Sequence, residues 1–197
     1  NADVLIVNTC GFIRSAKQEA IDAILTLAAH KQPDGRARYL VVAGCLAQRY
    51  AREIHQALPE VDAVLGTADY GRIAGLLQQL TDGQAVFKLP GQPGSLEHLK
   101  AARAPSTPAT HAWIKIAEGC SSHCAYCAIP AIRGEFHSRP VEEIVAEADR
   151  LSCQGYGELL LIAQDTGRYG LDLYGKRSLA DLLTALCRLP LVRLVRI

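Results

Sequence analysis

The chain has 197 residues, of which 49% are hydrophobic and 21% are charged, and its formal net charge is +1. This length allows one large domain or two small ones, and the composition is that of an ordinary globular protein. A net charge close to zero does not indicate nucleic acid or an anionic membrane as partner, and without a run of eighteen apolar residues we expect no membrane-spanning helix. The seven cysteines, three of them closely spaced, indicate a reducing cytoplasm rather than a disulfide framework.

The first 80 residues alternate strand-like and helix-like segments, and we expect them to form one domain. Apolar runs predict buried strands, and apolar residues at helical spacing predict helices between them. Ser15 and Gln18 fit a capping box at the start of the first helix. This alternation predicts an open parallel sheet of the Rossmann or flavodoxin type, covered by helices on both faces. The strands are expected at residues 3–7, 39–43 and 61–65, and the helices at about 15–28, 47–58 and 70–80.

Residues 81–110 differ in composition, since they hold four of the nine prolines, and we interpret them as a linker. Residues 111–197 again alternate strands with helices and predict a second domain. Its strand, helix, strand, helix, strand order is the beginning of a β/α barrel, and a closed barrel needs more units. The elements are expected at residues 113–116, 140–153, 159–163, 179–189 and 191–197. Because the chain begins inside an expected strand and contains no methionine, we expect it to be a segment of a longer protein.

Cys120, Cys124 and Cys127 form a C-x3-C-x2-C run in the loop that follows the first expected strand of the second domain. Three thiolates on one short loop can hold three corners of a 4Fe-4S cube, which normally takes four cysteine ligands. The remaining iron would then be open to a substrate, as the free position of a catalytic metal site is. Zinc is the alternative, but it needs a fourth ligand, and His123 adjoins Cys124 too closely for both side chains to reach one ion easily.

Cys10 and Cys45 each lie just past one of the first two expected strands. In an open parallel sheet, ligands bind in the crevice beyond the carboxyl ends of the strands. Each cysteine alone could be a small buried apolar residue. Their matching positions in the topology favour a shared metal site.

Polar residues of the second domain are expected at the active face of the partial barrel. Gln164 and Asp165 follow its second strand, where barrel enzymes place ligand contacts, although a capping role in a polar loop is the alternative. Ser138 and Arg139 precede a predicted helix, whose amino terminus together with a guanidinium group suits an anionic ligand group. Tyr126, between two cysteines, could lie against an adenine or could simply pack on the barrel.

Five segments carry motifs that belong together, namely NTCGFIRSAKQEAID (8–22), GCLAQRY (44–50), EGCSSHCAYCAIPAIRG (118–134), SRPVEEI (138–144) and LLLIAQDTGRYGLDLYG (159–175). Together they resemble the methylthiotransferases of the radical S-adenosylmethionine class. The resemblance implies two 4Fe-4S clusters and S-adenosyl-L-methionine as cofactors. Cys120, Cys124 and Cys127 would bind the radical-generating cluster, while Cys10 and Cys45 would be two of three ligands of an auxiliary cluster. The third auxiliary ligand would lie upstream of residue 1.

The motifs are most similar to those of the branch that modifies a ribosomal protein. That branch adds a methylthio group to the β-carbon of one aspartate on small-subunit ribosomal protein number twelve. The resemblance therefore implies a transferase with a ribosomal protein as partner and an electron donor such as flavodoxin. A tRNA adenosine as substrate, or a zinc-stabilised module without catalysis, are the alternatives. Because the third auxiliary ligand and the remaining barrel strands are missing, we expect this segment alone to be inactive.

Overall fold

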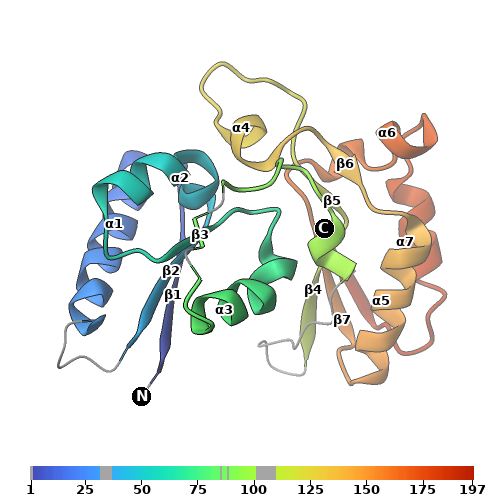
Figure 1. The fold of residues 1–197 in the computed structure, drawn as a ribbon. Coiled ribbons are helices and arrows are strands. Elements are labelled where there is room, and N and C mark those ends of the chain that lie inside the picture. The colour runs from blue at the N-terminus through green and yellow to red at the C-terminus, as the bar shows by residue number, and fades with distance from the viewer. Residues whose placement is uncertain (1, 32–36, 85, 88, 101–109) are drawn as a thin grey trace. The chain divides into compact units, whose positions relative to one another are not determined.

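The computed structural model describes residues 2–31, 37–84, 86–87, 89–100 and 110–197. The chain divides into two compact units (Figure 1). The first comprises Asn1–Ala101 and Cys124–Arg133, and the second comprises Ala102–His123 and Gly134–Ile197. Both units are built from parallel strands alternating with helices, which confirms the predicted α/β class. Among the described residues, none of the helices is long and apolar enough to cross a membrane.

The first unit contains a parallel three-stranded sheet in the order β1-β2-β3. Its strands are β1 (Val4–Thr9), β2 (Tyr39–Gly44) and β3 (Ala63–Leu65). The register of the first pair runs from Val4 opposite Tyr39 to Thr9 opposite Gly44, so β1 and β2 end at the same edge. Five of the six residues of β2 are buried, as expected for a strand whose two faces are both covered.

Helices cover both faces of this sheet. Helices α1 (Arg14–Ala28) and α2 (Cys45–Ala57) pack on one face, where Ile24, Leu40 and Val42 are fully buried. Helix α3 (Ile73–Thr81) packs on the other face, where Leu80 and Val86 contact Val41. The unit also contains short 3-10 helices, namely η1 (Ala29–Lys31), η2 (Tyr70–Arg72) and η3 (Glu97–Lys100).

The capping box predicted for Ser15 and Gln18 is wrong. Helix α1 begins at Arg14, so its N-cap is Ile13, an apolar side chain that cannot accept a hydrogen bond. Gln18 instead donates a hydrogen bond of 2.9 Å to Asp22 along the helix surface.

Part of the predicted linker belongs to the first unit. Val86 is 4% exposed in the core, and the ring of Phe87 stacks on His55 with a centroid distance of 3.8 Å. Apolar burial therefore attaches this stretch to the sheet and to α2. Residues 101–109 of the linker lie outside the described residues.

The second unit contains a parallel sheet in the order β4-β7-β8, formed by β4 (His111–Lys115), β7 (Glu158–Ile162) and β8 (Leu194–Arg196). Helices α5 (Val141–Cys153) and α7 (Leu179–Leu186) pack on one face of it, where Ile114, Ile144 and Leu182 are fully buried. This is the β/α alternation expected for the start of a barrel. Its smaller elements are the antiparallel pair β5 (Ala117–Glu118) and β6 (His137–Ser138), η4 (Thr166–Arg168) and α6 (Leu171–Tyr174).

A buried polar chain ties the elements of the second unit together. The hydroxyl of Tyr169 donates to the carbonyl of Arg139 at 2.7 Å. The guanidinium of Arg139 donates to the carbonyl of Lys115 at 2.7 Å and to the carboxylate of Glu147 at 2.8 Å. Burial is the main cause that raises the pKa of Tyr169 above its ordinary value.

Replacement of Tyr169 by Phe tests this chain. We expect a loss of about 1 kcal/mol of unfolding free energy at neutral pH, because one buried hydrogen bond is removed. Since the pKa of Tyr169 is raised in the folded state, the wild type keeps this contribution below about pH 10 and loses stability as the pH rises further. The variant should lack that alkaline component.

Urea denaturation at neutral and alkaline pH measures both effects. Tyr126→Phe is the control, because the side chain of Tyr126 is 91% exposed. If the unfolding free energy of wild type and of Tyr169→Phe fell equally between neutral and alkaline pH, the prediction would be contradicted.

Candidate functional site

The two strand-end cysteines of the first unit lie at adjacent positions of one sheet edge. Cys10 directly follows β1, and Cys45 directly follows β2 as the first residue of α2. Thr9 and Gly44, the residues before them, are register partners, and neighbouring strands are about 4.8 Å apart. Cys10 is exposed, Cys45 is buried, and both are free thiols. The structure therefore places the two predicted auxiliary-cluster ligands at neighbouring strand ends, and their role as ligands stays a prediction.

Gly11 allows the loop after Cys10 to approach Cys45. A Cβ atom at Gly11 would lie 2.9 Å from both the carbonyl carbon and the carbonyl oxygen of Cys45. No ordinary side chain fits at that distance from a backbone, so only glycine permits this approach. Glycine at position 11, directly after Cys10, is therefore explained by the limited space beside the backbone of Cys45.

The second half of the cysteine run belongs to the first unit and forms a turn. The amide of Cys127 donates to the carbonyl of Cys124 at 2.9 Å, and the amide of Ile129 donates to the sulfur of Cys127 at 3.4 Å. A short helix that the sequence did not predict, α4 (Ile129–Arg133), follows this turn. Tyr126 is 91% exposed, so it is not held by packing, and its predicted contact with adenine stays a prediction.

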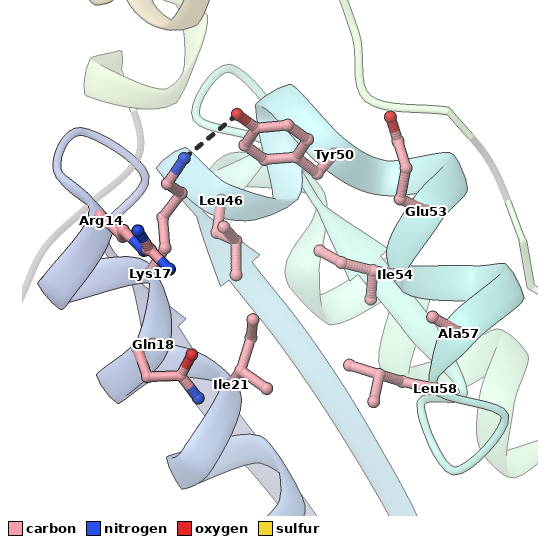
Figure 2. A pocket seen from close by; sticks show the side chains of 10 residues that line it. All are labelled: Arg14, Lys17, Gln18, Ile21, Leu46, Tyr50, Glu53, Ile54, Ala57 and Leu58. Carbon is pink, nitrogen blue, oxygen red and sulfur yellow. Dashed lines mark hydrogen bonds between the residues drawn. The ribbon is translucent and has the colours of Figure 1, made fainter.

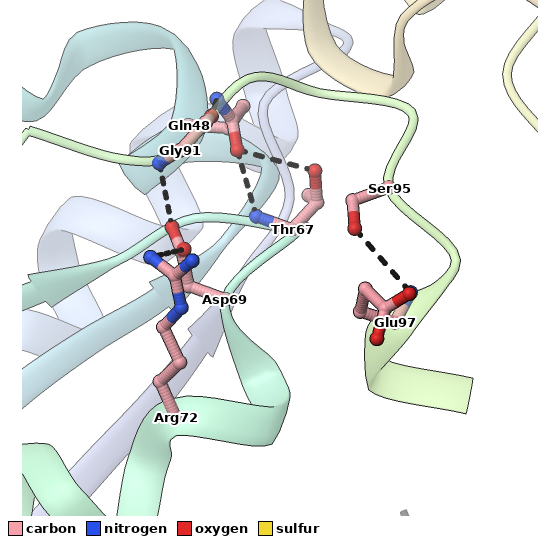
Figure 3. A network of polar contacts seen from close by, with 7 residues as sticks. All are labelled: Gln48, Thr67, Asp69, Arg72, Gly91, Ser95 and Glu97. Carbon is pink, nitrogen blue, oxygen red and sulfur yellow. Dashed lines mark hydrogen bonds and ion pairs between the residues drawn. The ribbon is translucent and has the colours of Figure 1, made fainter. Parts of the chain in front are cut away.

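Helix α4 is anchored within the first unit by its last two residues. Ile132 is fully buried, and its carbonyl accepts a hydrogen bond of 3.0 Å from the hydroxyl of Thr67. The guanidinium of Arg133 donates to the sulfur of Cys45 at 3.5 Å. Gln48, one turn beyond Cys45 in α2, accepts a hydrogen bond of 2.9 Å from the amide of Thr67 (Figure 3). Helix α2 is therefore linked to α4 through a buried threonine.

The side-chain amide nitrogen of Gln48 is also hydrogen-bonded. It donates to the carbonyl of Gly91 at 3.0 Å, and the amide of Gly91 donates to Asp69 at 2.8 Å. Asp69 also pairs with Arg72 at 3.3 Å (Figure 3). Gln48 thus uses both ends of its side-chain amide, and its orientation beside Thr67 is determined.

Cys120 lies in the second unit, at a point where two backbone segments cross closely. Gly119 has a φ of +75°, and a Cβ there would lie 2.0 Å from the carbonyl oxygen of Glu135. The amide of Cys120 donates to the carbonyl of Gly134 at 3.0 Å. His123, before the second cysteine, has a φ of +47°, a left-handed conformation that costs a non-glycine residue about 1–2 kcal/mol.

Ser138 and Arg139 make contacts inside the second unit. The hydroxyl of Ser138 donates to Asp172 at 2.6 Å and accepts from the amide of Gly170 at 2.9 Å. Arg139 is 4% exposed and is paired with Glu147. Asp172 and Glu147 were not among the predicted site residues, because a lone acid on a helix gives no sequence signal. The direct roles of Ser138 and Arg139 in ligand binding stay predictions.

Gln164 and Asp165 follow β7, whose last residue Ile162 pairs with Lys115, the last residue of β4. Gln164 is exposed and Asp165 is half-buried. Both therefore lie at the carboxyl end of the parallel sheet, where barrel enzymes place their ligand contacts.

Among the described residues, no group of three or more His, Cys, Asp or Glu side chains is already arranged to hold a metal ion. All seven cysteines are free, and thiolate sulfur is the ligand of iron–sulfur clusters. The donor chemistry at both cysteine sets therefore fits such clusters.

A hollow between α1 and α2 of about 420 Å³ is lined by Ile21, Leu46, Ile54 and Leu58, with Lys17 and Tyr50 bonded at its rim at 3.4 Å (Figure 2). None of the predicted site residues lines this hollow. The candidate site is consequently defined by the cysteines and not by the cavity beside them.

Comparison with known proteins identifies a matching family model, similar sequences and similar folds. Residues 1–66 match the model of the family described as "Uncharacterized protein family UPF0004". This match covers the strands β1, β2 and β3 and includes both Cys10 and Cys45.

The whole chain is homologous to proteins named "Ribosomal protein uS12 methylthiotransferase RimO", which confirms the resemblance inferred from the motifs. It is 50% identical to that of Symbiobacterium thermophilum over 196 residues, 100% of this chain and 40% of the relative. The relatives from Trichlorobacter lovleyi and Geobacter sulfurreducens are each 47% identical to this chain over its whole length. The chain covers 43% of the first relative and 44% of the second. The chain thus spans less than half the length of these curated relatives.

Solved structures of the radical S-adenosylmethionine methyltransferase TsrM from Kitasatospora setae share the fold. One, with cobalamin and a 4Fe-4S cluster bound, has a TM-score of 0.58 at 13% identity and covers 98% of this chain and 43% of that chain. Another, with tryptophan and an analogue of S-adenosylmethionine, has a TM-score of 0.60 at 14% identity over the same shares. At such low identity the likeness concerns the fold alone.

Replacement of Gly11 by Ala tests the close approach to Cys45. We expect a loss of about 1–3 kcal/mol of unfolding free energy, because the added methyl group collides with backbone atoms that cannot rotate away. Urea denaturation of the protein measures the change.

Gly75→Ala is the matched control. A Cβ at Gly75, on α3, meets nothing within 4 Å, so alanine there should be neutral or stabilising by up to about 1 kcal/mol. If both alanine variants were equally stable, the close approach of Gly11 to Cys45 would not be a real constraint.

Proposed function

We propose that the complete protein is a radical S-adenosylmethionine methylthiotransferase that modifies the β-carbon of an aspartate on ribosomal protein uS12. The observation that carries this proposal is that the first unit contains four of the five cysteines predicted to bind clusters. Cys10 and Cys45 follow neighbouring strands at one sheet edge, and Cys124 and Cys127 belong to the same unit. The identity of 50% and 47% to relatives named for this activity supports the substrate.

The cysteines would hold two 4Fe-4S clusters, of which Cys120, Cys124 and Cys127 bind one and Cys10 and Cys45 contribute to the other. When bound, the clusters and S-adenosylmethionine supply the radical and sulfur chemistry that no side chain can provide. The chain's own residues orient and shield them. Thr67 and Gln48 fix α4 after Cys127, and Gly11 brings the loop of Cys10 against Cys45.

Tyr126, Ser138, Arg139, Gln164 and Asp165 are proposed to form the S-adenosylmethionine site. The exposure of Tyr126 and Gln164 leaves their side chains available to a ligand. Ser138 and Arg139 already form hydrogen bonds with Asp172 and Glu147. They would therefore contribute mainly by shaping the wall of the site. In Arg139 the buried guanidinium holds the segment before α5 in place.

Partners follow from the same proposal. The protein would act in the cytoplasm on the ribosomal protein and receive single electrons from a donor such as flavodoxin.

Anaerobic incubation of the complete protein with uS12 and, in parallel, with undermodified tRNA identifies the substrate by mass spectrometry. Methylthiolation of the aspartate alone is expected, whereas modification of a tRNA adenosine would assign the other substrate class.

Replacement of Cys127 by Ala in the complete protein tests the cluster assignment. We expect iron and sulfide after anaerobic reconstitution to fall by about half, because one of two clusters is lost. Reductive cleavage of S-adenosylmethionine should fall to background. Absorbance, metal analysis and detection of 5′-deoxyadenosine measure these effects.

Cys153→Ala is the matched control, since Cys153 is an exposed free thiol at the end of α5, outside both cysteine sets. It should retain full iron content and full cleavage. Reductive cleavage that survives in Cys127→Ala would overturn the assignment, and zinc in place of iron would favour the non-catalytic alternative.

A further inference from the structure

We propose that Arg133 is a positioning residue that makes the auxiliary cluster easier to reduce, through its hydrogen bond to the sulfur of Cys45. This inference rests on the proposed function, which makes Cys45 a ligand of that cluster. The contact lies within the first unit and joins residues 88 positions apart in the chain.

The placement of Arg133 is determined by its neighbours. Arg133 is the last residue of α4, and Ile132 before it is fully buried and bonded to Thr67. Thr67 in turn is held by Gln48 of the same helix that begins with Cys45. The backbone of Arg133 is therefore attached to helix α2, which begins with Cys45. This attachment keeps the guanidinium of Arg133 beside the sulfur of Cys45.

The surroundings of Cys45 strengthen this contact. Cys45 is 5% exposed and Arg133 is half-buried, so water screens their interaction less than it would at a surface. An arginine donor beside sulfur brings both a hydrogen bond and a fixed positive charge. The contact of 3.5 Å is an ordinary length for a donor to sulfur.

Hydrogen bonds to cysteine sulfur and nearby charge are among the factors that set the reduction potential of an iron–sulfur cluster. Reduction adds one negative charge, which a nearby cation stabilises more than it stabilises the oxidised state. Arg133 should therefore raise the midpoint potential of a cluster bound by Cys45. A merely structural arginine would leave that potential unchanged.

The experiment uses the complete protein with Cys120, Cys124 and Cys127 all replaced by Ala, so that only the auxiliary cluster can be bound. Arg133→Ala and Arg133→Lys are introduced in this background, and the midpoint potential is determined by anaerobic dye-mediated titration followed by electron paramagnetic resonance. We expect unchanged iron content, a clearly lower potential in Arg133→Ala and an intermediate value in Arg133→Lys, which keeps the charge but loses the planar donor.

Arg52→Ala is the matched control, because Arg52 is an exposed arginine on the same helix as Cys45. It should leave the potential unchanged. An unaltered potential in both Arg133 variants, with iron bound, would overturn this inference and leave the proposed function intact. Loss of iron in both Arg133 variants but not in Arg52→Ala would also overturn it, because Arg133 would then be needed for assembly. Absence of iron with Arg133 intact would overturn the auxiliary cluster itself.

Discussion

The register of β1 against β2 is the constraint on which the candidate site depends. The two strands run parallel from Val4 opposite Tyr39 to Thr9 opposite Gly44, and each is followed at once by a cysteine. A slip of one residue would turn every side chain of β1 to the other face of the sheet and bury the wrong set. The hydrophobic core beneath α1 and α2 therefore also determines where Cys10 and Cys45 emerge.

The supports of the cysteines are mostly backbone contacts and small polar side chains. Gly11 and Gly119 leave room for a second chain segment at close distance, and a Cβ at either position would collide with backbone atoms. Thr67 and Gln48 then attach α4 through buried hydrogen bonds. Such supports are specific because a buried polar group that loses its partner costs about 1–3 kcal/mol.

The second unit shows how residues proposed for ligand binding can also have a structural role. Arg139 joins the end of β4, the middle of α5 and Tyr169 in one buried chain of hydrogen bonds. Ser138 and Asp172 form a second connection beside it. These contacts hold Ser138 and Arg139 in place without a ligand, and such preorganisation reduces the entropy lost on binding.

The sequence by itself determined the alternation of strands and helices, the spacing of the three-cysteine run and the strand-end positions of Cys10 and Cys45. Local periodicity and local spacing encode these features, so they can be read along the chain. The tertiary structure alone decided that Arg133 meets Cys45, that Thr67 anchors α4, and that Arg139 is buried against Glu147. The first two contacts join residues 88 and 65 positions apart, and such pairings depend on the path of the intervening loops, which no local pattern records.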